Sequence, residues 1–202
     1  MNILIKEEDG LFRKGIEEIF KTLTSSTAAY TLNFSPEVTD ISNNVDIVVL
    51  PLCKGEIKLC SPFLENPDCR LMIGILDENE VLPGTLPACY MGTEFIYRSD
   101  SFDRVRQVLI RGLIKMTSRN VMHHDCDCIG CLDGRMTRPQ MHIMQKIIQG
   151  KSPKQMADEF GINEKTLYSR KKLLMNRFGL STDYELINLM RKLTFRIPVR
   201  NI

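Results

Sequence analysis

The sequence predicts two domains: an N-terminal α/β domain with a five-stranded parallel sheet and a C-terminal all-α domain of four helices. Short apolar segments alternate with helical patterns before residue 115, as in a parallel sheet. The charge also changes sign along the chain. Residues 1–135 hold 14 Lys/Arg and 20 Asp/Glu, net −6, whereas residues 136–202 hold 13 and 5, net +8. We expect domains at residues 1–115 and 136–202, joined by a linker at residues 116–135.

The α/β domain opens with an expected strand at residues 2–5 and a helix. The apolar positions of this helix are Leu11, Phe12, Ile16, Ile19 and Phe20. Further strands are expected at residues 29–34, 45–50, 71–76 and 94–97. The segment 47–50 is continuously apolar, as buried parallel strands are. A closing helix is expected at residues 102–113, with one apolar stripe that serves as core, dimer surface or both: Phe102, Val105, Leu109 and Leu113.

The connections between the middle strands are expected to be short or distorted. Their prolines interrupt regular helices. These prolines are Pro36, Pro62, Pro67, Pro83 and Pro87.

In the all-α domain, residues 152–178 predict a helix-turn-helix. Ser152, Pro153 and Gln155 form a capping-box sequence that begins one helix. Gly161 permits a sharp turn, and Asn163 is the expected N-cap of the next helix. On the first helix, the residues expected to face the core are Met156, Ala157 and Phe160, and Ile162 is expected to fill the space between the helices. On the second helix, the expected buried residues are Leu167, Leu174 and Phe178.

The opposite face of the second helix is polar and cationic. Its outward residues are Lys165, Tyr168, Ser169 and Lys172. Such a face fits a DNA major groove, where side chains contact base edges while cations neutralise phosphates. The alternative is a solvated surface helix in a bundle.

Residues 136–193 resemble the DNA-binding domain of the LuxR/FixJ/NarL family. The matching motifs are Met136-Thr137, residues 147–157, Ile162, Thr166-Leu167 and residues 177–180. The chain departs from the family at Pro139-Gln140 and at Arg170, although Gln140 can still complete a capping box with Thr137. The resemblance implies base contacts by Tyr168, Ser169 and Lys172, and phosphate contacts by Lys154, Thr166 and Arg177. With the cations of the recognition helix, the expected DNA-binding residues are Lys154, Lys165, Thr166, Tyr168, Ser169, Arg170, Lys172 and Arg177.

The first domain resembles a CheY-type receiver, which implies a flavodoxin-like fold. Residues 3–5 and 11–16 match its opening strand and helix, with Glu7-Glu8 at the acidic pair that binds metal in the family. Receiver phosphorylation needs a carboxylate nucleophile after the third strand. Pro51 stands there, so we expect a pseudo-receiver that is not phosphorylated, unless a local shift lets Asp46 or Asp77 serve.

Other receiver positions are altered as well. Arg98 stands at the expected Lys, and the switch hydroxyl position falls among residues 75–77. We therefore expect Glu7 and Glu8 to form a solvated acidic turn rather than a magnesium site.

The linker concentrates metal-ligating residues. Its candidates are His123, His124, Cys126, Cys128 and Cys131. Thiolates and imidazoles bind zinc, so these residues are candidates for a zinc site. Cys128 and Cys131 could instead form a redox pair. All candidates lie within nine residues, however, whereas structural zinc sites use separated ligand pairs. An inert linker is favoured, with no metal. The scattered Cys53, Cys60, Cys69 and Cys89 are expected to be ordinary apolar residues.

The last expected helix begins at a capping box of Thr182 and Glu185. Its apolar stripe contains Leu186, Ile187, Met190 and Leu193. The stripe either closes the four-helix core or also pairs two DNA-binding domains, as the matching helix often does in the family.

These features predict a transcription regulator that binds double-stranded DNA as a homodimer or as a heterodimer with a related family member, and recruits or blocks RNA polymerase. The strongest variant resembles RcsA-type auxiliary regulators. Two alternatives are a protein that sequesters a related regulator and a metal or thiol sensor that uses the linker. No enzyme activity or cofactor is expected. The odd number of cysteines, seven, and the absence of a signal sequence indicate a cytoplasmic protein, and the family resemblance implies a bacterial one associated with the nucleoid.

Overall fold

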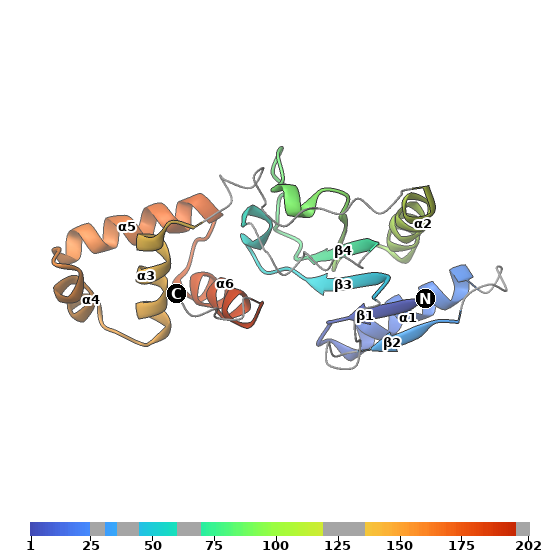
Figure 1. The fold of residues 1–202 in the computed structure, drawn as a ribbon, viewed down its shortest axis with the longest axis horizontal. Helices are drawn as coiled ribbons and strands as arrows, with labels where there is room; N and C mark the ends of the chain where they lie inside the picture. Colours follow the sequence, from blue (N-terminus) through green and yellow to red (C-terminus); the bar gives the residue numbers. More distant parts are fainter. Residues whose placement is uncertain (25–30, 36–44, 60–69, 119–135, 197–202) are drawn as a thin grey trace. The chain divides into compact units, whose positions relative to one another are not determined.

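The computed structural model describes residues 1–24, 31–35, 45–59, 70–118 and 136–196 (Figure 1). The chain forms two compact units. The first contains residues 1–52, 65–79 and 90–126, and the second contains residues 53–64, 80–89 and 127–202. Within the described residues, every helix is too short or too polar to cross a bilayer.

The first unit is a parallel five-stranded sheet with strand order β2-β1-β3-β4-β5. Its strands are β1 (Asn2–Ile5), β2 (Asn33–Ser35), β3 (Ile47–Pro51), β4 (Leu71–Leu76) and β5 (Glu94–Tyr97). The predicted α/β fold is thereby confirmed. Helices α1 (Gly10–Thr24) and α2 (Phe102–Ser118) pack on the sheet through one apolar cluster that includes Ile3, Ile16, Phe20, Ile73 and Leu109.

Two of the apolar residues that the sequence places in these helices are exposed. Leu11 is 88% exposed, because it lies on the opposite side of α1 from the buried Ile16, Ile19 and Phe20. Phe102 is 61% exposed at the first residue of α2, where the helix has only begun to cover the sheet, whereas Val105 and Leu109 are buried as predicted. Strand β2 begins at Asn33, later than expected, and α2 continues to Ser118.

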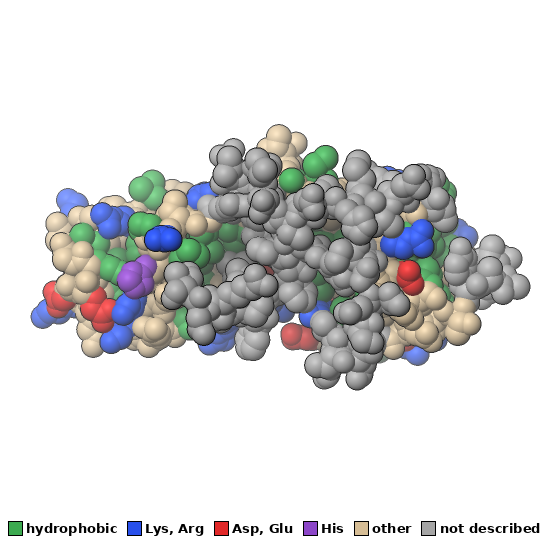
Figure 2. All heavy atoms as spheres, in the orientation of Figure 1, with side chains coloured by type: hydrophobic (Ala, Val, Ile, Leu, Met, Phe, Trp, Pro, Cys, Tyr) green, Lys and Arg blue, Asp and Glu red, His purple; other side chains and the backbone are tan. Residues whose placement is uncertain are grey.

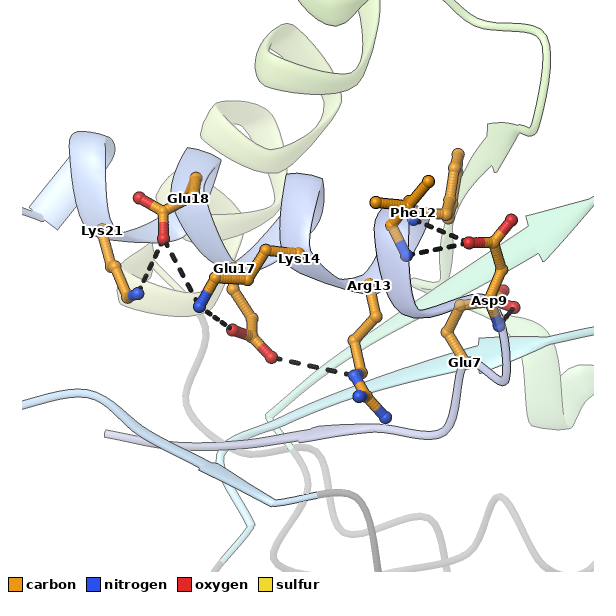
Figure 3. A network of polar contacts seen from close by, with 9 residues as sticks. Glu7, Asp9, Phe12, Arg13, Lys14, Glu17, Glu18 and Lys21 are labelled. Atoms are coloured by element: carbon orange, nitrogen blue, oxygen red, sulfur yellow. Dashed lines mark hydrogen bonds and ion pairs between the residues drawn. The ribbon is translucent and has the colours of Figure 1, made fainter.

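The outer face of α1 is neutralised by its own ion pairs (Figure 3). Asp9 begins the helix, with Oδ1 accepting from the backbone N–H groups of Leu11 and Phe12 at 2.9 and 3.1 Å. Further along, Lys21 donates to Glu18 at 2.8 Å and lowers the pKa of that carboxyl. This face therefore presents little net charge to a partner.

The crossovers differ from the helices that usually connect parallel strands. Residues 77–93, all of which the structure describes, contain a single turn of 3₁₀ helix, η4 (Ala88–Tyr90), and no α-helix. After β3, the described residues 52–59 hold another such turn, η2 (Glu56–Lys58). The prediction of short or distorted crossovers is confirmed for these residues.

Among its described residues, the second unit contains four α-helices, as predicted: α3 (Arg138–Ile148), α4 (Pro153–Phe160), α5 (Glu164–Phe178) and α6 (Asp183–Arg196). One apolar cluster joins α3, α4 and α5 through Ile143, Met156, Ala157 and Leu167. A second cluster contains residues of α3, α5 and α6 and of residues 53–59: Cys53, Leu59, Met144, Leu174, Phe178, Leu180, Leu186, Leu189 and Met190.

Candidate nucleic-acid interface

Helices α4 and α5 form the predicted helix-turn-helix. The capping box is present, with Ser152 Oγ accepting from Gln155 N at 3.2 Å and Gln155 Oε1 accepting from Ser152 N at 2.9 Å. Gly161 adopts a φ of +62°, a left-handed conformation that strains residues with a Cβ. Ile162 N then donates to the carbonyl of Ala157 at 3.0 Å, and this bond closes the turn.

Helix α5 starts at Asn163, whose Oδ1 accepts from Thr166 N at 2.7 Å. Leu167, Leu174 and Phe178 are buried and fix which side of α5 faces the core. Tyr168 is consequently 62% exposed, and Lys165, Ser169 and Lys172 are exposed with it. These four residues, which we call the α5 front, present one phenol ring with its hydroxyl, one serine hydroxyl and two ammonium groups.

The cations near this surface divide into two groups. Lys154, Lys165, Arg170 and Lys172 are exposed and form no ion pair with any acidic side chain that the structure describes. Lys171, in contrast, contacts Asp183 at 2.6 Å and ties α5 to α6. Figure 2 shows Lys and Arg side chains on the surface over α5. The unpaired group supplies uncompensated positive charge, which attracts a polyanion.

Arg177 is placed differently from the other expected phosphate contacts. Its Nη1 donates to Gln140 Oε1 at 2.9 Å, and the same oxygen accepts from Thr137 N at 3.0 Å in the capping box of α3. The guanidinium also lies 5.3 Å from the ring centroid of Phe178. Arg177 therefore holds the end of α5 against the start of α3, a role that sequence reasoning missed because Gln140 looked like a capping residue alone.

Glu159 is a further residue that the sequence did not reveal as important. It pairs with Lys146 at the end of α3 and, at 3.3 Å, with Lys151 in the loop between α3 and α4. The hydrogen bond from Lys146 is the main cause of the lowered pKa of Glu159. Two cations near the helix-turn-helix are thus partly neutralised, so the positive charge concentrates on α5 and Lys154.

The expected solvated acidic turn in the first unit is wrong for Glu7. This side chain is only 4% exposed, and its Oε2 accepts from Arg98 Nη2 at 2.8 Å. Arg98 Nε also lies 3.3 Å from Asp77 Oδ1, while Glu8 is exposed as expected. The error arose because no local pattern indicates that Arg98, 91 residues away, reaches Glu7. Pro51 ends the neighbouring strand β3.

The metal-ligating candidates His123, His124, Cys126, Cys128 and Cys131 lie outside the described residues, as do Cys60 and Cys69. Cys53 is buried in an apolar cluster and Cys89 is partly buried. No group of three or more potential metal ligands occurs within the described part of the chain.

The comparisons with known proteins concern the domain and the fold. Residues 135–194 match a family model described as bacterial regulatory proteins, luxR family. A solved complex of the two-component response regulator RcsB with DNA has a similar fold, with a TM-score of 0.54 and 15% identity over 96% of this chain and 99% of that chain. A structure of two RcsB dimers bound to two parallel DNAs has a TM-score of 0.51 and 15% identity, again over 96% of this chain and 99% of that chain. No curated protein sequence matches.

Proposed function

Residues 135–194 form a luxR-family helix-turn-helix domain, and we propose on this basis that the chain is a sequence-specific transcription regulator that binds double-stranded DNA. The observation that supports the proposal most directly is the α5 front, where Tyr168, Ser169 and Lys172 are exposed on a helix with a buried apolar back. In a helix-turn-helix, the second helix enters the major groove and side chains near its N-terminus contact base edges.

The roles of individual residues follow from their positions on this surface. Tyr168, Ser169 and Lys172 contact base edges, and Lys165 and Arg170 flank them with positive charge. Lys154 and Thr166 contact phosphates from the starts of α4 and α5, where backbone N–H groups also favour an anion. Arg177 contributes through its bond to Gln140, which orients α5, as well as through its charge.

We further propose that the first unit is a pseudo-receiver. Pro51 has no nucleophilic side chain, and the buried carboxylate of Glu7 is already compensated by Arg98. Receiver phosphorylation requires a bound divalent metal. A carboxylate that is already paired with a cation gains less free energy from binding such a metal. DNA binding is then controlled by the amount of protein or by a partner.

The regulator acts as a dimer on a site with approximate two-fold symmetry, because each helix-turn-helix reads one half-site. The partner is a second copy or a phosphorylatable member of the same family, as in auxiliary regulators of the RcsA type. The resulting complex recruits or blocks RNA polymerase.

The test is to map chromosomal binding sites of the full chain in cells with and without each candidate partner. Sites that persist in every background indicate a homodimer, and sites that vanish with one partner indicate a heterodimer. The matched control is the Tyr168→Ala/Lys172→Ala variant at equal protein level, which should lose these sites. An absence of wild-type sites in all backgrounds would contradict DNA binding and favour sequestration of a related regulator.

A further inference from the structure

Residues 53–59, which follow β3 in sequence, belong to the same compact unit as the helix-turn-helix. Cys53 and Leu59 are 8% and 2% exposed and share an apolar cluster with residues of α3, α5 and α6. Burial of such residues is a stabilising contribution that is lost when they are removed from their neighbours. We call residues 53–59 the inserted segment.

Polar contacts fix the inserted segment on α6 and on the end of α5. Lys54 Nζ lies 2.9 Å from Glu185 Oε1 in the first turn of α6, with both side chains about two-thirds or more buried (32% and 24% exposed). Lys58 lies at Gly179, the C-cap of α5, so close that a Cβ built on Gly179 would be 2.6 Å from its Nζ. An ammonium group is favourable there because helix C-termini carry partial negative charge.

The backbone of the segment approaches α5 most closely at Gly55. This residue has a φ of +81°, and a Cβ built on it would lie 2.6 Å from the carbonyl oxygen of Phe178. Real Cβ atoms do not approach a backbone oxygen this closely, so only glycine permits the contact. The approach joins two stretches more than 100 residues apart in sequence.

The shape of the segment is maintained by its own hydrogen bonds. Glu56 is fully buried, and its Oε2 accepts from Cys53 N at 2.9 Å. Gly55 N donates to Glu80 Oε1 at 3.2 Å, and Glu80 is 8% exposed in a second segment, residues 80–89, that belongs to the same unit. Burial of a carboxylate is costly unless hydrogen bonds compensate it, and these backbone N–H groups supply part of that compensation to Glu56 and Glu80.

We propose that the inserted segment is an integral part of the DNA-binding unit, closing its core at α6 and at the end of α5. The apolar core of the luxR-type helices is then incomplete without residues 53–59. This proposal concerns the folding of the unit and holds whether or not the chain binds DNA.

One experiment uses glycine substitutions in the full chain, read by amide hydrogen exchange and mass spectrometry. Gly55→Ala should accelerate exchange in peptides covering residues 178–186 by about tenfold, because the methyl group displaces the segment. Gly150→Ala is the matched control: Gly150 lies in the same unit with a φ of +71°, but an added Cβ meets nothing within 4 Å. Both glycines have a positive φ, so the difference between the two variants reports the close contact at Gly55 and not the cost of placing alanine at a positive φ.

A charge exchange gives a second, independent measurement. Lys54→Glu and Glu185→Lys should each accelerate exchange in α6. The double variant rebuilds the ion pair in reverse but not the bonds that Glu185 accepts from the N–H groups of Ser181 and Thr182, so it should restore part of the protection relative to Glu185→Lys alone. The proposal would be overturned if Gly55→Ala and Gly150→Ala changed the exchange rates equally and the effects of the two charge reversals were additive. Faster exchange for Gly55→Ala with restoration in the double variant supports it.

Discussion

Arg98, the residue after β5, and Glu7, the second residue after β1, form an ion pair of 2.8 Å. In an open parallel sheet, the carboxyl ends of the strands line the crevice where ligands bind. Glu7 also accepts from Asp9 N at 2.9 Å, so both of its oxygens are bonded. Arg98 therefore compensates the buried charge of Glu7, and Asp77 extends the same network through Arg98.

We predict that the purified full chain does not accept a phosphoryl group from acetyl phosphate and Mg²⁺. Pro51 offers no carboxylate at the end of β3, and Glu7 is held by Arg98. The intact mass should stay constant, whereas phosphorylation adds about 80 Da. A phosphorylatable family member, treated in parallel, is the positive control. A shifted species would refute the pseudo-receiver, and fragmentation would identify whether Asp46 or Asp77 had been modified.

Removal of Arg98 should destabilise the first unit. Arg98→Met leaves the Glu7 carboxylate buried without its cation, and breaking such a pair costs about 2 kcal/mol once the partial exposure of Arg98 is considered. Urea unfolding measures the change. The double variant Arg98→Met/Glu7→Gln should recover part of the loss, because no buried charge remains.

The matched control for this experiment is Glu8→Gln, which removes an exposed neighbouring carboxylate. Its free energy of unfolding should stay within about 0.5 kcal/mol of the wild type. Equal losses for Glu8→Gln and Arg98→Met would show that the ion pair has no special role.

The sequence predicted those features that depend on local residue patterns. Both capping boxes of α3 and α4, the N-cap Asn163 and the buried stripe of α5 are each encoded within a few residues, and all are present. Strands β1, β4 and β5 were predicted at their observed bounds, because short apolar runs between polar turns are distinctive.

Features that depend on distant residues were missed. The bond between Arg177 and Gln140 and the pair between Lys54 and Glu185 join residues 37 and 131 positions apart. Helical periodicity contains no information on such pairs, since each partner alone resembles an ordinary surface residue. The inserted segment was missed for the same reason, because residues 53–59 were assigned to the α/β domain by their order in the chain.

Substitutions on the α5 front should alter sequence preference. Tyr168→Ala and Lys172→Ala remove groups that we place at base edges, and each should cost about 1–3 kcal/mol at the preferred site with less effect on random DNA. Binding sites selected in vitro from random DNA with wild type and variants measure this change. An unchanged selected sequence for both variants would contradict the assignment of the recognition helix.

Lys154→Ala should weaken binding evenly across DNA sequences. A lysine that contacts only phosphate contributes through counterion release, so its loss should lower the slope of log affinity against log salt by about one. Titrations at several salt concentrations with selected and random DNA test this expectation. Lys14→Ala, on the paired outer face of α1, is the control and should leave the slope unchanged.

The contact between Lys54 and Glu185 should weaken in acid. The hydrogen bond from Lys54, followed by the backbone N–H of Ser181, holds the pKa of Glu185 below its ordinary value of 4.5. Because the folded-state pKa is lowered, the ionised carboxylate stabilises the folded state fully above pH 4.5, and this contribution is lost as the pH falls through the folded-state pKa. Glu185→Gln keeps a side chain suited to the capping box of α6 but removes the charge. Thermal unfolding of both proteins between pH 7 and pH 3 should therefore show a stability difference that shrinks below pH 4.5. A difference that stays constant over this range would mean that the charge of Glu185 does not hold the inserted segment on α6.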